Sequence, residues 1–252
     1  MSQPLSSVLW PASIRWFDLT LPTPAENLAL DEALLSEVDA NPSRAVLRVW
    51  ESNTYCVVLG RSNHVETEVD ESQCRKEGIP ILRRSSGGGT VVIGPGCLAF
   101  AMALPLTDSH RTLGVATITL ALMERVASGL RAAIPSITVC GTSDLAIDGR
   151  KFSGNSERWL RHGFLHHGTI LYDFDLPRIA RLLKMPARVP EYRSGREHND
   201  FLTNIALSRT RLVEIVVEAW NATLSCCDAR TLGHAAELTR TRYCRDEWNL
   251  SR

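Results

Sequence analysis

Residues 83–96 read Arg-Arg-Ser-Ser-Gly-Gly-Gly-Thr-Val-Val-Ile-Gly-Pro-Gly and place two arginines beside three consecutive glycines. Glycine loses more backbone entropy on folding than other residues, so such a run indicates a positive φ or a close approach to the backbone. Bare N–H groups beside guanidinium groups form a site for a carboxylate or a phosphate. The stretch therefore predicts an anion-binding loop, with a tight hairpin and incidental arginines as the alternative.

Two later stretches carry side chains that could act on a bound anion. Asp144 precedes an Asp-Gly turn signal, and Lys151 follows that turn in the segment Arg-Lys-Phe-Ser-Gly. Lysine is a compact cation for a carboxylate or phosphate oxygen. Asp144 could hold Mg²⁺, which takes one or two carboxylates together with phosphate oxygens. His166 and His167 are equally consistent with two satisfied strand side chains, one inward and one outward.

Strands and helices of mixed order must position these stretches. Apolar and β-branched runs predict strands at residues 14–19, 45–50, 55–60, 79–82, 90–93, 97–104, 137–140, 144–147 and 163–172. Periodic apolar positions and capping signals predict helices at residues 25–38, 69–77, 112–133, 175–183, 210–224 and 229–243. This order favours an α+β fold, in which a mixed or antiparallel β-sheet is packed with helices, over a doubly wound sheet.

Three local predictions concern which strands pair and which side of a helix faces solvent. Residues 45–50 and 55–60 are expected to form a hairpin through a short turn, and Asp148-Gly149 is a strong signal for a second hairpin. Asp31 and Glu32 fall inside the first helix, and charged helix positions usually lie on a solvated face.

Composition and charge narrow the class of protein. The 252 residues include 28 basic and 28 acidic ones, which argues against a nucleic-acid or membrane-surface binder. No apolar run reaches the length of a membrane helix, and residues 1–7 lack the features of a signal peptide, so a cytoplasmic protein is expected. The seven cysteines are scattered without a Cys-x-x-Cys pair, which predicts reduced thiols rather than a zinc site; Cys140 alone is expected near the chemistry.

Taken together and in order, these stretches resemble the lipoate–protein ligase family within the biotin/lipoate ligase superfamily. Residues 83–89 resemble that family's Arg-Arg-x-Ser/Thr-Gly-Gly-Gly signature, residues 149–154 its Gly-Lys/Arg-Lys-x-Ser-Gly signature, and residues 166–171 its His-His-Gly-Thr-Leu-Leu strand. Residues 27–32, 48–50, 59–61 and 243–249 also fit the family pattern. The resemblance covers nearly the whole chain, which implies a single ligase-like catalytic domain over residues 1–252.

The resemblance also implies a reaction. Lipoate or octanoate and ATP, with Mg²⁺, give an acyl-adenylate, and the acyl group passes to a lysine of a lipoyl-domain protein. Lys151 is then the catalytic residue, and Asp144 is the expected metal ligand. The residues expected to bind the substrate and the adenylate are Arg84, Ser86, Gly87, Gly88, Gly89, Ser153, Gly154, His167, Gly168 and Thr169.

Three departures from the family pattern leave other functions open. Ile93 stands where the family usually has histidine, Ser143-Asp144 stands where it often has Asn-Asp, and the chain ends soon after Trp248, without the accessory domain of full-length ligases. Some family members take that domain from a separate protein. The alternatives are a carrier-to-protein octanoyl or lipoyl transferase that forms a thioester on Cys140, which would be activated by the neighbouring Lys151, and a non-catalytic partner that binds the acyl group or adenylate.

Overall fold

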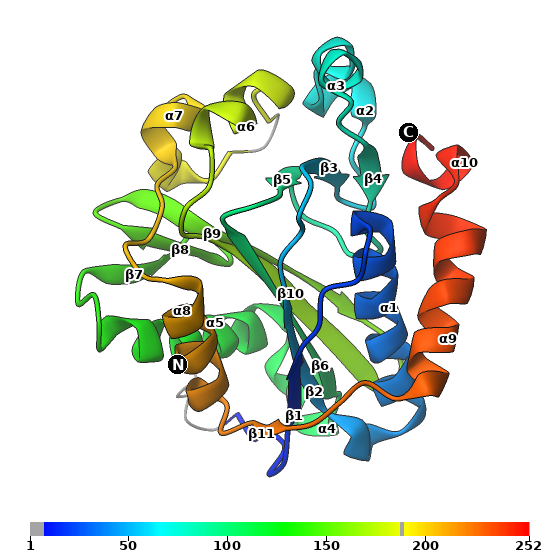
Figure 1. Ribbon diagram of the computed structural model, residues 1–252. Helices are drawn as coiled ribbons and strands as arrows, with labels where there is room; N and C mark the ends of the chain where they lie inside the picture. The colour runs from blue at the N-terminus through cyan, green and yellow to red at the C-terminus, as the bar shows by residue number, and fades with distance from the viewer. Residues whose placement is uncertain (1–7, 187–188, 252) are drawn as a thin grey trace.

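The computed structural model describes residues 8–186 and 189–251 and contains two β-sheets packed with helices (Figure 1). The strands are β1 (Arg15–Asp18), β2 (Val46–Trp50), β3 (Cys56–Leu59), β4 (Ile81–Arg83), β5 (Val91–Ile93), β6 (Cys97–Pro105), β7 (Ile137–Cys140), β8 (Asp144–Ile147), β9 (Arg150–Trp159), β10 (Gly163–Leu171) and β11 (Thr223–Leu224). The larger sheet has the order β11-β1-β2-β6-β10-β9-β8-β7, and the smaller has the order β4-β3-β5. Residues 1–7, on which the prediction about a signal peptide rests, lie outside the described residues.

The larger sheet is mixed, as predicted. β1 pairs in parallel with β2 and β11, whereas the other pairings of this sheet are antiparallel. β9 is a strand that the sequence does not predict, because its residues Arg-Lys-Phe-Ser-Gly-Asn-Ser-Glu-Arg-Trp show no apolar alternation.

The predicted hairpin of residues 45–50 and 55–60 is wrong. β2 lies between β1 and β6 in the larger sheet, whereas β3 lies between β4 and β5 in the smaller one. Every residue of both strands is buried, so neither strand carries the alternation that would identify its partner. The residues between β2 and β3 therefore connect two sheets. The Asp148-Gly149 hairpin is confirmed, with positive φ at both turn residues.

The helices are α1 (Pro24–Ala40), α2 (Val65–Glu68), α3 (Glu71–Glu77), α4 (Asp108–Leu113), α5 (Val115–Arg131), α6 (Leu176–Leu182), α7 (His198–Phe201), α8 (Arg209–Ala219), α9 (Ala229–Leu238) and α10 (Asp246–Asn249). Short helical turns lie at η2 (Pro42–Arg44), η3 (Glu191–Arg193) and η4 (Thr239–Tyr243). The helix predicted over residues 112–133 is interrupted, because Gly114 has φ +78° and separates α4 from α5. Among the described residues, no helix has the length and apolar composition needed to cross a membrane.

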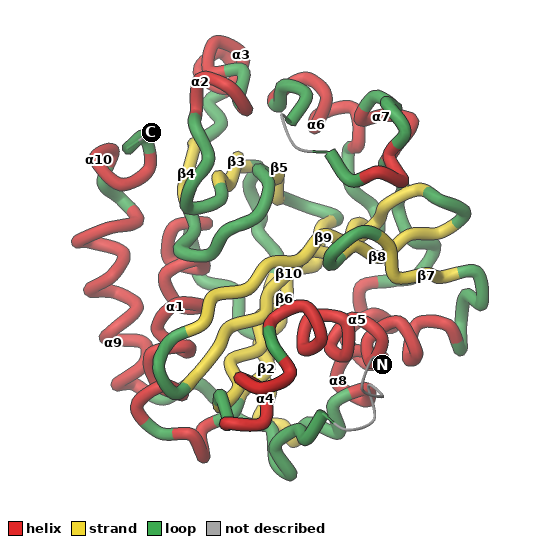
Figure 2. The backbone as a smooth tube through the Cα atoms, turned by 180° about the vertical axis from the view of Figure 1, so that it is seen from behind, coloured by secondary structure: helices red, strands yellow, loops and turns green. Residues whose placement is uncertain are grey.

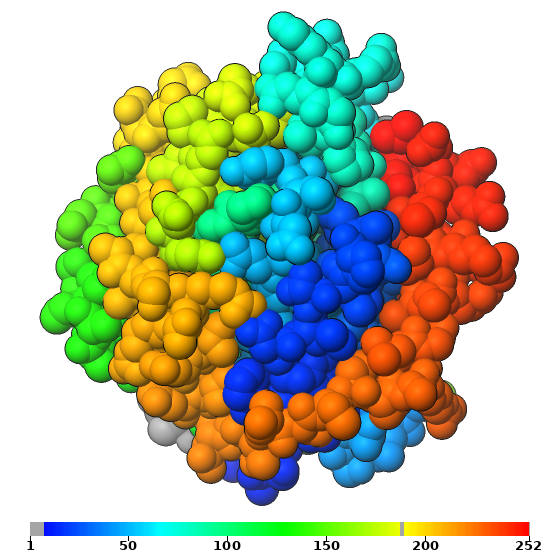
Figure 3. Space-filling view, in the orientation of Figure 1, coloured from blue at the N-terminus to red at the C-terminus, as the bar shows by residue number. Residues whose placement is uncertain are grey.

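The helices cover both faces of the larger sheet (Figure 2). α5 and α8 pack on one face through a core that includes Leu122, Val126 and Ile215. α1 packs on the opposite face, and α9 runs beside it. The segment of α2 and α3 stands out at the top of the molecule in the space-filling view (Figure 3). Figure 1 shows the smaller sheet at one end of the larger one. The glycine-rich stretch directly follows β4 of the smaller sheet.

The solvated face predicted for Asp31 and Glu32 is wrong. α1 is enclosed by the larger sheet and α9, so that Asp31 is 3 % and Glu32 is 6 % exposed. Each carboxylate has its partners in distant parts of the chain. Glu32 accepts hydrogen bonds from the guanidinium groups of Arg158 and Arg242 and from the hydroxyl of Tyr243. Buried charges of this kind persist only where they are paired.

Replacing Glu32 with glutamine is expected to lower the free energy of unfolding at pH 7 by about 2 kcal/mol, because charged hydrogen bonds are lost. Burial alone raises the pKa of Glu32, but the hydrogen bonds from Tyr243, Arg242 and Arg158 outweigh burial and lower it. This stability is present above the unfolded pKa and is lost as the pH falls through the folded one. Urea unfolding of both proteins should therefore show a difference at pH 7 that shrinks below pH 4.5, the ordinary value for glutamate.

The control is Glu214→Gln, which removes an exposed ion pair with Arg211. Exposed pairs contribute little, so this variant should follow the wild type at both pH values. If wild type and Glu32→Gln differed in free energy of unfolding by the same amount at pH 7 and at low pH, the stabilising role of the charged Glu32 carboxylate would be contradicted.

Candidate functional site

Strands β8, β9 and β10 bring polar residues and glycines into register on one face of the larger sheet. Asp144 pairs with Gly154, which pairs with Thr169, and in the next position Ser156 pairs with His167. We call these five residues the strand platform. Leu165, two residues before His167 on β10, packs with Leu35 of α1. The platform therefore lies on the α1 face of the sheet.

Lys151 lies over this platform. Its Nζ atom is 2.7 Å from Asp144 Oδ1, and about a quarter of its side chain is exposed. A Cβ atom at position 154 would lie 2.8 Å from Lys151 Nζ, so only glycine there allows the ammonium group this approach. The other carboxylate oxygen, Asp144 Oδ2, accepts a hydrogen bond of 2.8 Å from the hydroxyl of Tyr192.

The two arginines before the glycines are buried and shape the loop. Arg84 donates to Ser86 Oγ at 3.0 Å and to the carbonyl groups of Gly87 and Gly89. Arg83 donates to the carbonyl groups of residues 60, 61, 63 and 248, on the other side of β4. Burial lowers the pKa of Arg84 to about 10, which leaves it charged at neutral pH. Both guanidinium groups are therefore directed at main-chain carbonyls, and a role for Arg84 in substrate binding stays a prediction.

The glycines themselves face outward, over the platform. Gly87, Gly88 and Gly89 are exposed, and the Gly87 carbonyl accepts a hydrogen bond of 2.8 Å from Ser156 Oγ. Within the described residues, the N–H groups of these three glycines donate no main-chain hydrogen bond. The loop therefore presents free backbone donors beside a platform that carries a lysine, which is the arrangement an anion requires.

A chain of hydrogen-bonding groups connects the loop with α1. Ser86 Oγ lies 2.6 Å from His167 Nε2, and His167 Nδ1 lies 3.8 Å from Asp31 Oδ2. Arg84 donates to Ser86 Oγ, and the tautomer of the imidazole decides which of Ser86 Oγ and His167 Nε2 donates to the other. Burial lowers the pKa of His167, and Asp31 opposes this only in part, so the imidazole is neutral.

Asp31 is in turn fixed by the core. Arg48, which is fully buried, donates to Asp31 Oδ1 at 2.6 Å, and Trp50 Nε1 donates to Asp31 Oδ2 at 3.3 Å. The sequence marks both regions only through the family resemblance at residues 27–32 and 48–50. Helix periodicity gave no sign of this role, because the partners lie on a strand 17 and 19 residues further along the chain.

Most of the predicted site residues meet here, and two face elsewhere. Ser153 pairs with Leu145 and Ile170, and both of these belong to the core on the α5 face. Ser153 accepts a hydrogen bond of 3.1 Å from Asn155 Nδ2, and the Asn155 side chain covers Gly168 on that same face. Adjacent strand residues point to opposite faces, so Ser153 and Gly168 support the platform from behind. Their role in binding the substrate and the adenylate stays a prediction.

Cys140 lies at the edge of the site. It ends β7 opposite Asp144, it is partly exposed, and its Sγ atom lies 3.4 Å from Thr138 Oγ1. All seven cysteines lie within the described residues and are free thiols. Ile93, which replaces the family's histidine, is buried in β5.

Asp144 offers a metal ion one carboxylate at this site. Both carboxylate oxygens of Asp144 have partners, and the described residues contain no group of three His, Cys, Asp or Glu side chains that could hold a metal. One carboxylate fits Mg²⁺ that is already carried by phosphate oxygens. Asp144 as a metal ligand therefore remains a prediction for Mg²⁺ bound to a nucleotide.

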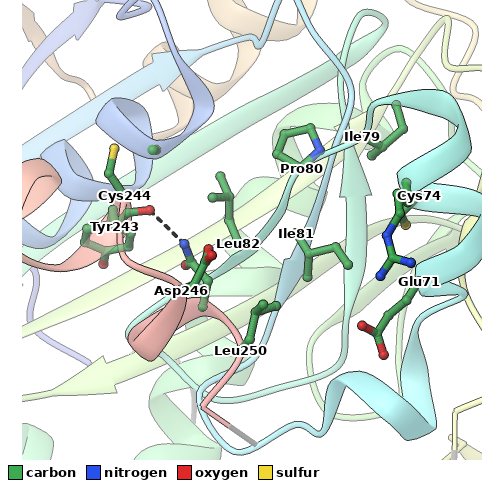
Figure 4. Close-up of a pocket in the computed structure, with 13 residues that line it drawn as sticks. Glu71, Cys74, Ile79, Pro80, Ile81, Leu82, Tyr243, Cys244, Asp246 and Leu250 are labelled. Carbon is green, nitrogen blue, oxygen red and sulfur yellow. Dashed lines mark hydrogen bonds between the residues drawn. The ribbon is translucent and has the colours of Figure 1, made fainter.

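A separate hollow of about 460 Å³ lies between α3, β4 and α10 (Figure 4). Its walls include Cys74, Ile81, Leu82, Tyr243 and Leu250. Asn249, which also lines it, donates a side-chain hydrogen bond to the Tyr243 carbonyl. None of the predicted site residues lines it. We therefore place the candidate site at the strand platform, where the charged and hydrogen-bonding groups converge.

Comparison with protein families matches residues 23–224 to the lipoyl protein ligase A/B catalytic domain. The chain is 32 % identical over 162 residues to the probable lipoate-protein ligase A of Mycoplasma pneumoniae, covering 64 % of this chain and 46 % of that protein. It is 31 % identical over 171 residues to the corresponding protein of Mycoplasma genitalium, covering 67 % and 49 %. The chain thus spans about half the length of these curated relatives.

Three solved structures share the fold. A bi-partite lipoate protein ligase of Thermoplasma acidophilum, studied with its E2 lipoyl domain, matches with a TM-score of 0.83 and 22 % identity over 94 % of this chain and 96 % of that one. A putative lipoate protein ligase of the same organism with bound lipoic acid gives 0.80 and 19 %, over 95 % and 99 %. A lipoate-protein ligase A bound with ATP gives 0.76 and 22 %, over 94 % and 98 %. At these identities the likeness shows a common fold.

Proposed function

Because this chain belongs to the lipoyl protein ligase A/B catalytic domain family, we propose that it attaches lipoate or octanoate to a lysine of a lipoyl-domain protein through an acyl-adenylate. The acyl carboxylate attacks the α-phosphorus of ATP, which gives the adenylate and pyrophosphate. The amine of the acceptor lysine then attacks the acyl carbon, loses a proton, and releases AMP. Relatives of the same fold that bind lipoic acid and ATP, and one studied with a lipoyl domain, support these substrates.

One observation carries the proposal: a lysine ammonium and the free backbone donors of the glycine run lie over the same strand platform. Negative charge grows on carboxyl and phosphate oxygens in both steps, and preorganised donors stabilise it. Lys151 would leave Asp144 for these oxygens, while the glycine loop holds the acyl chain and the phosphate. Mg²⁺ would enter with the nucleotide and offset the charge of its phosphates.

The decisive experiment is mass spectrometry of a lipoyl domain incubated with the purified chain. One mixture contains lipoate, ATP and Mg²⁺, a second contains octanoyl carrier protein without ATP, and a third contains an acceptor whose target lysine is replaced by arginine. We expect acylation in the first mixture alone. Acylation in the second mixture, which lacks ATP, would show instead that the chain is a carrier-to-protein acyltransferase.

Two further parts of the proposal concern surroundings of the enzyme. We propose a cytoplasmic location, because seven free thiols suit a reducing compartment. We also propose a separate accessory protein as a partner, because some members of the family take the accessory domain from another chain. Adenylate formation by the purified chain in the absence of any other protein would remove that requirement.

Replacing Cys140 with serine is expected to leave most of the ATP-dependent activity, because an adenylate route needs no nucleophilic sulfur. Serine has nearly the same volume, and without a dedicated base it is a weak nucleophile. Initial rates of lipoyl-domain acylation should be compared with those of Cys226→Ser, which alters an exposed cysteine outside the site. A dead Cys140→Ser enzyme, together with an octanoyl adduct on Cys140 of the wild type, would identify a thioester route instead.

A further inference from the structure

Tyr192 connects a separate segment of the chain to the Asp144–Lys151 pair. It lies in η3, between α6 and α7, and its hydroxyl donates to Asp144 Oδ2 at 2.8 Å. Lys151 Nζ takes the other oxygen, Oδ1, at 2.7 Å. The Asp144 carboxylate therefore has one partner on each oxygen. Tyr192 lies 48 residues after Asp144 in the sequence, and Lys151 lies 7 residues after it.

The surroundings of Tyr192 hold its ring in place. The ring packs against Phe201 of α7, with centroids 5.2 Å apart. Arg196 donates to the Tyr192 carbonyl at 2.7 Å and to the carbonyl of Gly149, in the β8–β9 turn, at 3.0 Å. Arg193 and Arg196 each donate to the other's carbonyl group. These contacts attach η3 to the hairpin that carries Asp144 and Lys151.

The χ2 torsion of Asp144 is fixed only by hydrogen bonds to its carboxylate, such as the one from the Tyr192 hydroxyl. The χ2 torsion of aspartate is broad, so the side chain itself does not fix the plane of its carboxylate. A hydroxyl donor on Oδ2 fixes that plane and directs Oδ1 toward Lys151. Burial and the negative charge of Asp144 raise the pKa of Tyr192, so the hydroxyl remains a donor at neutral pH.

We propose that Tyr192 is a positioning residue: by holding Asp144 it sets where the Lys151 ammonium rests, over Gly154 and within reach of the glycine loop. The role rests on the proposed function, in which Lys151 passes from Asp144 to the carboxyl and phosphate oxygens. Tyr192 itself touches no reacting atom. Removal of its hydroxyl lets the carboxylate rotate, so that Lys151 samples other positions and meets the substrate oxygens less often.

The test uses Tyr192→Phe, which keeps the ring on Phe201 and removes the hydroxyl alone. The chain contains only three lysines, Lys76, Lys151 and Lys184, so an amine-reactive reagent can be followed at each by mass spectrometry. Without substrates, we expect Lys151 to react severalfold faster in the variant, toward the rate in Asp144→Asn. Lys76 and Lys184 are exposed and should react at wild-type rates, as internal references.

The kinetic readout separates positioning from binding. The kcat of acylation should fall about tenfold, the factor that corresponds to the loss of one ordinary hydrogen bond, while the KM for lipoate changes little. Tyr172→Phe is the matched control, because it removes another tyrosine hydroxyl bonded to a carboxylate, that of Glu51. It should change neither Lys151 labelling nor kcat.

The outcomes distinguish this proposal from the proposed function. Wild-type labelling of Lys151 in Tyr192→Phe, or slower labelling, would overturn the positioning role whatever the enzyme's activity. If the wild type forms no adenylate, the proposed function fails, whereas faster labelling in Tyr192→Phe would still support the restraint of Lys151. A rise in KM with unchanged kcat would make Tyr192 a binding residue and contradict the proposal.

Discussion

Replacing Lys151 with alanine is expected to reduce adenylate formation and acyl transfer at least about a hundredfold, the usual cost of one preorganised donor to a developing negative charge. Lys151 lies over the strand platform, and its ammonium is 2.7 Å from Asp144. Alanine leaves the carboxylate with its Tyr192 hydrogen bond, so the local fold should persist. Adenylate formation can be followed by pyrophosphate release and transfer by mass spectrometry of the lipoyl domain.

Lys184→Ala provides the control for charge. Lys184 is exposed and donates to the main-chain carbonyl of Glu66, away from the platform. Its removal should leave both rates near those of the wild type. Near-normal turnover by a folded Lys151→Ala protein would exclude Lys151 from the mechanism and would undermine the assignment of the site.

Replacing Gly88 with valine is expected to weaken lipoate and adenylate binding about tenfold or more. Gly88 has φ +84°, where a β-branched residue costs roughly 1–2 kcal/mol. A Cβ atom there would also lie 2.9 Å from Arg84 Nη2 and 3.2 Å from Ser156 Oγ. The guanidinium that shapes the loop and the serine of the platform would both have to move.

Isothermal calorimetry with lipoate measures the effect directly. Gly89→Ala is the matched control, because a Cβ atom at that position meets nothing within 4 Å and the residue has no positive φ. The affinity of Gly89→Ala for lipoate should fall far less than that of Gly88→Val. Equal affinities of wild type and folded Gly88→Val would mean that the glycine run is structural only.

The features of the fold that the sequence predicts are those that depend on local patterns of residues. The mixed sheet, the β7–β8 strands and the turn at Asp148 follow from β-branched runs and from turn chemistry, and the structure confirms them. The site residues followed mainly from the family resemblance, because an isolated lysine or a pair of histidines carries little information. Ser86, Lys151 and His167 do meet at one platform.

The failures have a common physical cause, which is pairing between distant parts of the chain. Asp31 and Glu32 were expected in solvent because a helix pattern cannot reveal partners such as Arg48 or Arg242, which lie 17 and 210 residues further along the chain. β2 and β3 were expected to pair because they are adjacent in sequence, although they belong to different sheets. The contact of Tyr192 with Asp144, 48 residues away, cannot be predicted for the same reason, since nothing in the sequence around Tyr192 indicates Asp144.

The long spans of these contacts also govern how the site is acquired during folding. Ser86 and His167 are 81 residues apart, and Tyr192 and Asp144 are 48 residues apart. Closing such loops costs entropy before any contact is gained, and folds rich in them form slowly. The hairpin at Asp148 can form early, from local contacts, and yet it carries only one wall of the site. Completion of the site therefore requires long-range closures of the chain in addition to this hairpin.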